Sequence, residues 1–152
     1  TVSTVAPGTK FKMEIKNSTE CYTYIFGQET DGTSYTLFPY PNKDDATKTS
    51  FSPYCGITGY RLFPRGKSLV PDNIGKKDVF AIVVTKQALD WYAINNAITK
   101  SSGANYEAKV ADALKQNAVA GVSFSAGTGG TINFKANNPQ QNAVLCVVEV
   151  NK

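Results

Sequence analysis

The feature that most constrains the fold is an alternating apolar stretch, residues 21–27, followed by a polar turn and a second apolar stretch, residues 35–38. In the first stretch, aromatic side chains alternate with small or β-branched ones: Tyr22, Tyr24 and Phe26 on one face, and Cys21, Thr23 and Ile25 on the other. A strand with two such faces is typical of the middle of a sheet that is covered on both sides. The sequence therefore predicts a central strand here.

The turn and the prolines that follow this strand predict a β-hairpin. Gly32 stands in the polar turn, where a positive φ angle is expected. Pro39 and Pro41 have no backbone N–H, so the second strand cannot continue past Phe38. We expect residues 21–27 and 35–38 to pair as antiparallel neighbours.

Other parts of the chain repeat the strand pattern. Residues 9–16 alternate between apolar and charged side chains, which predicts a half-buried strand. The nearly continuous apolar runs at residues 78–85 and 143–150 are typical of core strands. Shorter strands are expected at residues 60–63, 119–125 and 130–135.

The period of the pattern changes from that of a strand to that of a helix near residue 90. Asp90 and Asn105 are each expected to cap the start of a helix, the second of which extends to about residue 116. The apolar stripes of these two helices are Ile94 with Ile98, and Tyr106 with Val110 and Leu114.

Long polar turns between short strands favour antiparallel sheets over alternating strand–helix units. We therefore predict a mainly β fold, an immunoglobulin-like antiparallel β-sandwich of roughly seven to nine strands. The two short helices, about residues 90–117, are inserted before the C-terminal hairpin. The length of 152 residues predicts a single domain, residues 1–152, and a start at Thr1 without methionine suggests excision or processing from a longer protein.

Charge and hydropathy exclude two classes of partner. The net charge is +4, but all basic residues except Arg61 and Arg65 are lysines, and they are spread along the chain. Nucleic-acid binding normally uses a clustered basic face, so we expect no nucleic-acid partner. No apolar run approaches the ~20 residues that span a bilayer, so we expect no membrane insertion of this segment.

The chemistry-bearing residues do not form a recognisable catalytic or metal-binding motif. The chain has no histidine, which excludes Ser-His-Asp and Cys-His catalysis and argues against zinc sites built on Cys and His. The best acids, Asp44, Asp45 and Asp72, lie in polar loops where nothing obvious raises a carboxyl pKa. The glycines at 127–130 match no phosphate-binding motif. We therefore expect no catalytic residues, no metal and no cofactor, and we do not expect an enzyme.

The three cysteines leave at least one thiol unpaired. Cys21 opens the central strand and Cys55 lies in a corner loop, so these two are candidates for a disulfide between sheets. The alternative is that Cys21, Cys55 and Cys146 are all small buried apolar residues.

Three corners of the chain bring prolines together with aromatic or arginine side chains, and they suggest a partner surface. Loops fixed by proline lose little entropy on binding, and Tyr and Arg are enriched at interaction hot spots. If the strands that precede these corners end at the same edge of the sandwich, Tyr40, Tyr54 and Arg65 form one surface. The alternative is that the tyrosines cover the open end of the sandwich and that Arg65 is solvated.

Read as a whole, the chain resembles a known bacterial family, domain of unknown function 4384, over roughly residues 10–151. The resemblance rests on the order of residues 22–26, 31–32, 37–39, 79–85 and 88–90. It implies a β-sandwich-like module that is often part of a larger envelope, secreted or signalling protein. It implies no activity, because the family has no agreed catalytic residues, and the three cysteines are not part of its pattern.

These observations leave three functional hypotheses. The first is a non-catalytic interaction or accessory module of a bacterial envelope or secreted protein, extracytoplasmic, with a protein partner or a second copy of itself. The second is a structural subunit of a surface assembly or filament, because the alternating N-terminal strand could pair with another subunit. The third is an enzyme of unrecognised type.

Overall fold

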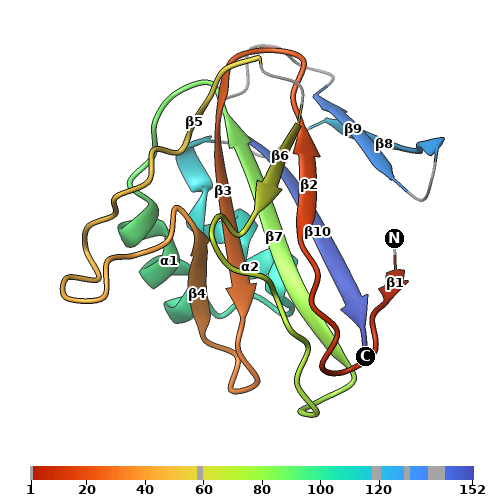
Figure 1. The fold of residues 1–152 in the computed structure, drawn as a ribbon. Helices are drawn as coiled ribbons and strands as arrows, with labels where there is room; N and C mark the ends of the chain where they lie inside the picture. Colours follow the sequence, from red (N-terminus) through yellow and green to blue (C-terminus); the bar gives the residue numbers. More distant parts are fainter. Residues whose placement is uncertain (1, 58–59, 118–120, 129–130, 137–142) are drawn as a thin grey trace.

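The fold is built on one main sheet. The computed structural model describes residues 2–57, 60–117, 121–128, 131–136 and 143–152. The main sheet has the strand order β1-β10-β7-β3-β4, and β5 also lies beside β3 (Figure 1). Its strands are β1 (Val2–Thr4), β3 (Cys21–Gln28), β4 (Ser34–Phe38), β5 (Tyr54–Cys55), β7 (Lys77–Thr85) and β10 (Ala143–Asn151). Six of the eight residues of β3 are buried, which confirms the predicted central strand.

The main sheet is antiparallel except at one edge. β7 pairs along its whole length with β10 on one side, and its residues 80–85 pair with β3 on the other. β1 differs, because Val2–Thr4 pairs in parallel with the end of β10. The sequence pattern did not predict this strand, since three residues carry too little periodicity to reveal it.

β4 and β5 are two halves of one edge strand. Both pair antiparallel with β3, β4 near the end of β3 and β5 at Cys21 and Tyr22. The Thr23 N–H donates to the Pro53 carbonyl at 2.9 Å, just before β5 begins. The chain between the two halves leaves the sheet at Pro39 and returns at Pro53, so the predicted end of the strand at Phe38 is confirmed.

Two helices cover one face of the main sheet (Figure 1). They are α1 (Trp91–Lys100) and α2 (Tyr106–Ala113). Both predicted caps are confirmed, because Asp90 accepts from the Ala93 N–H at 3.0 Å and Asn105 accepts from the Ala108 N–H at 2.8 Å. α2 is shorter than predicted, since the chain tightens into a 3-10 turn at Lys115–Asn117. All five residues of the predicted apolar stripes are buried.

The opposite face of the main sheet is covered by two separate two-stranded ribbons. One ribbon pairs β2 (Met13–Lys16) with β6 (Tyr60–Phe63), and the other pairs β8 (Val122–Ala126) with β9 (Ile132–Ala136). Ile15 and Phe63 from the first ribbon pack on Ile25, Phe80 and the neighbouring apolar side chains of the sheet. The predicted mainly β, sandwich-like fold is confirmed, with a second layer that consists of two pieces.

β2 is shorter than the predicted strand, which began at residue 9. The last pair of the β2–β6 ribbon is Met13 with Phe63, and Pro64 then offers no backbone N–H to extend it. Phe11 instead forms an isolated bridge with Leu69. The predicted strand at residues 119–125 is observed from Val122 onward, since residues 118–120 lie outside the described part of the chain. Within the described residues, no helix is long and apolar enough to cross a membrane.

Candidate binding groove

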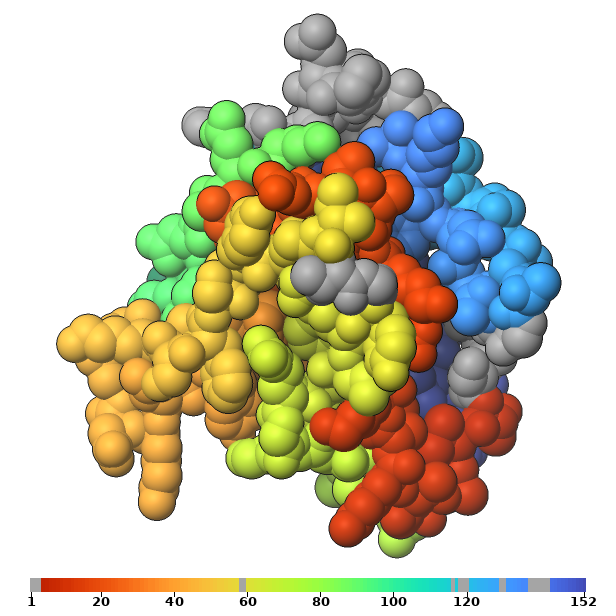
Figure 2. Space-filling model, turned by 45° about the horizontal axis from the view of Figure 1, so that its top comes forward, coloured from red at the N-terminus to blue at the C-terminus, as the bar shows by residue number. Residues whose placement is uncertain are grey.

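A concave surface lies between the two ribbons. A cavity of about 690 Å³ separates β2 from β9, and a second cavity of about 300 Å³ continues it toward the loop after β2. The two cavities share Ile15, Lys16 and Phe134, so they form one groove, called here the β2–β9 groove. In Figure 2 the blue β8–β9 hairpin stands apart from the red-orange segment that contains β2, and dark blue β10 is visible between them.

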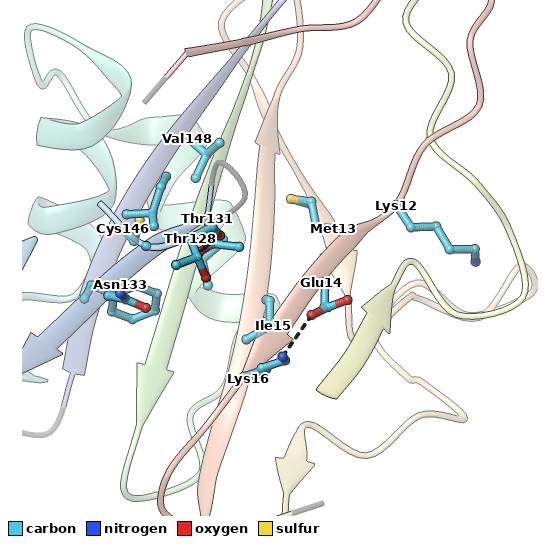
Figure 3. Close-up of a pocket in the computed structure, with 14 residues that line it drawn as sticks. Lys12, Met13, Glu14, Ile15, Lys16, Thr128, Thr131, Asn133, Cys146 and Val148 are labelled. Carbon is cyan, nitrogen blue, oxygen red and sulfur yellow. Dashed lines mark hydrogen bonds and ion pairs between the residues drawn. The ribbon is translucent and has the colours of Figure 1, made fainter. Parts of the chain in front are cut away.

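Both walls of the groove are strand edges without a neighbouring strand. β2 lines the groove but β6 does not, and β9 lines it but β8 does not. Because β2 pairs only with β6 and β9 pairs only with β8 in the described structure, the edge that each turns to the groove is unpaired. An unpaired edge presents a row of backbone N–H and C=O groups that can pair with another chain. Figure 3 shows β2 on one side and Thr131 and Asn133 on the other.

The floor of the groove is apolar and belongs to the main sheet. β7 contributes Ile82 and Val84, and β10 contributes Val144, Cys146 and Val148. Ile82 and Cys146 are buried, while the three valines are half-buried. The ribbons leave this strip of the sheet incompletely covered, which is the usual condition for an apolar contact with another molecule.

The rim of the groove is basic. Its charged lining residues are Lys12, Glu14, Lys16, Lys86 and Lys135. Glu14 forms an exposed ion pair with Lys16 at 3.6 Å, and the Lys12 ammonium donates to the Pro64 carbonyl at 2.7 Å. Lys86 and Lys135 form no ion pair with any described residue. Four lysines that are far apart in the sequence therefore lie around the β2–β9 groove.

The two cysteines proposed for a disulfide are direct cross-strand neighbours. Cys21 of β3 pairs with Cys55 of β5, and both are buried free thiols. A hydrogen bond from the Cys21 thiol lowers the pKa of Cys55, and the same contact together with burial raises the pKa of Cys21. Cys21 also lines the end of the groove, and the third thiol, Cys146, has a pKa raised by burial in its floor. The disulfide itself stays a prediction, but the expectation that it joins two sheets is wrong, because β3 and β5 are neighbouring strands of the same sheet.

The three residues of the predicted partner surface lie in different surroundings. Tyr40 and Tyr54 are 43% and 44% exposed. The Lys67 ammonium lies 4.6 Å from the centre of the Tyr40 ring, whereas the Tyr54 ring packs edge-on against Tyr22 at 5.7 Å. Arg65 is exposed in the turn after β6. The rings of the two tyrosines therefore contact different residues. A single surface formed by Tyr40, Tyr54 and Arg65 stays a prediction.

Sequence reasoning did not find the groove. Its walls and floor come from β2, β7, β9 and β10, which are distant in the chain and whose mutual placement no local pattern encodes. The alternation of Ile132 and Phe134 with Asn133 and Lys135 was the one available signal, because it marks β9 as a strand with one apolar face. No group of three or more Cys, Asp or Glu side chains in the described residues is placed to hold a metal ion.

Comparison with known proteins gives a family match for the N-terminal part of the chain. The sequence model of the family described as Domain of unknown function (DUF4384) matches residues 4–88, more than half of the 152-residue chain. That range includes β2 and β7, whereas the helices, β9 and β10 lie beyond it. No curated protein and no solved structure matches the chain. The predicted resemblance is confirmed at the level of the family, and the chain belongs to the domain of unknown function 4384 family.

Proposed function

We propose that this domain is a non-catalytic interaction module that binds a protein segment in the β2–β9 groove. The observation that carries the proposal is the combination of two unpaired strand edges with an apolar floor between them. Strand edges supply main-chain hydrogen bonds and an apolar floor supplies side-chain contacts, and recognition of an extended peptide needs both. As in the sequence-based expectation, we assign the module to a larger extracytoplasmic protein of the bacterial envelope or a secreted protein.

The side chains around the groove favour binding over catalysis. Catalysis by a general acid and a general base together needs two titratable groups within hydrogen-bond reach of the substrate. Among the described lining residues the only carboxylate is Glu14, which is exposed and engaged by Lys16. An interaction role needs no such pair of groups and uses the lysines as a basic rim.

A selection from a random peptide library against the immobilised domain tests the proposal. Val148 lies half-buried in the groove floor, so Val148→Trp fills space that a bound segment would occupy. Ile57 is 63% exposed and lies outside the groove, so Ile57→Trp is the matched control. Selected peptides should bind Val148→Trp at least about tenfold more weakly than the wild type, which corresponds to ~1.4 kcal/mol, and should bind Ile57→Trp unchanged.

Two results would contradict this assignment. One is the absence of any enriched peptide, and the other is binding that Val148→Trp leaves intact. If binding were lost instead in Tyr40→Ser or Tyr54→Ser variants that still fold, the partner surface would be the corners predicted from the sequence. Thermal unfolding of each variant establishes that it is folded before its binding is compared.

A structural role in an assembly is a second candidate, and one observation favours it. β1 pairs only with Glu149 to Asn151, so in the described structure the outer edge of β10 is unpaired from residues 143 to 148. Such an edge can pair with a second copy of the chain. Light scattering over a range of concentrations decides this, because a subunit of an assembly associates as concentration rises and a monomeric module does not.

A further inference from the structure

We infer that the segment bound in the β2–β9 groove is an acidic, extended stretch of a partner protein that enters as an additional β-strand. The strand joins the two ribbons into one continuous sheet in the order β6-β2-partner-β9-β8. This inference rests on the proposed function and adds the conformation, direction and charge of what the groove binds.

The backbone of the walls points to a strand. The unpaired edges of β2 and β9 face each other across the groove, over the same floor. A chain placed between them can satisfy backbone groups on both of its sides, as a central strand does. The inserted strand also covers the uncovered strip of β7 and β10, which completes the second layer of the sandwich.

The lining residues also fix the direction of the strand. One end of the groove is lined by Met13 of β2 with Ile132 of β9, and the other by Lys16 with Ala136. Residue numbers therefore rise in the same direction along both walls, so β2 and β9 run parallel to each other. A strand between two parallel neighbours can be antiparallel to both, which is the slightly more stable arrangement for each pair.

Side-chain alternation on the walls specifies the sequence of the partner. Ile15 and Phe134 turn inward and pack with the apolar cluster under the ribbons, while Lys16 and Lys135 are exposed. A strand in register with these walls places every second side chain on the apolar floor and the others between the two lysines. Opposite charges on neighbouring strands stabilise the pairing, so the outward residues of the partner are Asp or Glu.

The length of the contact is that of a short strand. The floor extends from Ile82 to Thr85 along β7 and from Val148 to Val144 along β10. At ~3.3 Å for each residue, the floor accommodates about five to six residues of extended chain. A partner segment of alternating apolar and acidic residues of that length fills it.

The test uses a synthetic peptide of about eight residues that alternates valine with glutamate and has blocked ends. Hydrogen exchange of the domain is measured with and without the peptide. Strand insertion slows exchange of amides in β2 and β9 by at least about tenfold, because their groove-facing N–H groups become hydrogen-bonded. The same peptide with every second backbone nitrogen methylated lacks donors along one edge and should bind at least about tenfold more weakly.

Charge is tested separately on the protein. The double variant Lys16→Glu, Lys135→Glu reverses the charge at two exposed sites of the rim and should weaken peptide binding by about tenfold. Lys43→Glu, in an exposed loop away from the groove, is the control and should bind much as the wild type does. A peptide that alternates valine with lysine should bind the wild type more weakly and the double variant more strongly.

The outcomes separate this inference from the function on which it rests. If the peptide competes with library-selected binders but leaves β2 and β9 amides unprotected, or if methylation has no effect, the groove is a binding site and strand insertion is wrong. If the lysine peptide binds as well as the glutamate peptide, the acidic partner is wrong. If the glutamate peptide fails to bind at millimolar concentration, the inference fails as a whole. The proposed function fails on different results, namely that no library peptide is enriched or that Val148→Trp leaves binding intact.

Discussion

At the scale of single residues, Gly27 shows how closely β3 and β4 pack. A Cβ atom added to Gly27 would lie 2.2 Å from the Cζ atom of the Tyr35 ring, which is shorter than any van der Waals contact. The Tyr35 ring therefore occupies the space that any other residue at position 27 would need. In the sequence this glycine stands within a strand pattern, and the reason for its presence becomes clear only from the position of its cross-strand neighbour.

Gly27→Ala is expected to lower the free energy of unfolding by about 1–3 kcal/mol, because the half-buried Tyr35 ring must move. Gly56→Ala is the matched control, since a Cβ atom at Gly56 would meet its nearest neighbour at 3.9 Å. Urea denaturation followed by circular dichroism compares the two variants. Equal stability of Gly27→Ala and Gly56→Ala would show that Tyr35 is not held in this position.

The Cys21–Cys55 pair gives a second prediction at this scale. The lowered pKa of Cys55 favours its thiolate, which can attack a small-molecule disulfide such as oxidised glutathione, and Cys21 then displaces the bound thiol to form the bridge. Closing this loop would contribute roughly 4 kcal/mol to stability in the chain-entropy model. After such oxidation, alkylation of the unfolded chain without reductant should label one thiol, Cys146.

Labelling of all three thiols under those conditions would show that the bridge does not form. Cys21→Ser is the control variant, because without Cys21 the mixed disulfide of Cys55 with glutathione is not displaced. The mass of the intact chain then includes the added glutathione, which distinguishes this state from a bridge. Reduction of the oxidised wild type before alkylation should restore labelling at all three cysteines.

At the scale of elements, an ion cluster joins the end of β10 to the turn before β7. The Lys152 ammonium lies 2.6 Å from an Asp72 carboxylate oxygen and 2.7 Å from one of Asp78, and its side chain is only 4% exposed. Hydrogen bonds from Lys152 and from the Ile74 N–H lower the pKa of Asp72. Burial alone would lower the pKa of Lys152, but hydrogen bonds to Asp72 and Asp78 outweigh it and raise that pKa.

These shifts fix the pH range in which the cluster stabilises the fold. The contribution of Asp72 is present above the ordinary carboxyl pKa of 3.8 and is lost as the pH falls through its lowered value. The contribution of Lys152 is lost only above its ordinary pKa of 10.5. Lys152→Met should therefore unfold at lower urea concentration than the wild type at pH 7, and the difference should shrink near pH 3. A difference in unfolding midpoint between Lys152→Met and the wild type that stays constant with pH would contradict the role of the ion pair. Lys43→Met is the control variant and should unfold as the wild type does at both pH values.

The elements divide into those that the sequence predicts and those that it does not. β3, β4, β6, β7, β10 and both helices were predicted within a few residues, because each has its own period, cap or proline boundary. β1 and the division of the second layer into two ribbons were not, since both depend on contacts between distant segments. The placement of three lysines also depends on contacts between distant segments. In the sequence they are scattered surface charges, but in the fold they all line one groove: Lys16, Lys86 and Lys135.

At the scale of the whole molecule, the β2–β9 groove joins the family region to the rest of the chain. Residues 4–88 supply one wall and half of the floor, and β9 and β10 supply the other wall and the other half. A fragment that ends after β7 would lack β9 and β10, so its groove would be open on one side. We therefore expect the binding surface to require β9 and β10 as well as the family region.

The β2–β9 groove is the proposed binding site for the partner, and methyl NMR during titration with the valine–glutamate peptide tests whether the domain binds there. Met13, Ile15 and Ile82 line the groove, whereas Ile94 and Ile98 belong to α1 and pack on the opposite face of the sheet. We expect the methyl signals of the three groove residues to shift with peptide concentration while those of Ile94 and Ile98 stay in place. Shifts confined to the helix side, or methyl signals in the groove that do not move while the peptide binds, would contradict it.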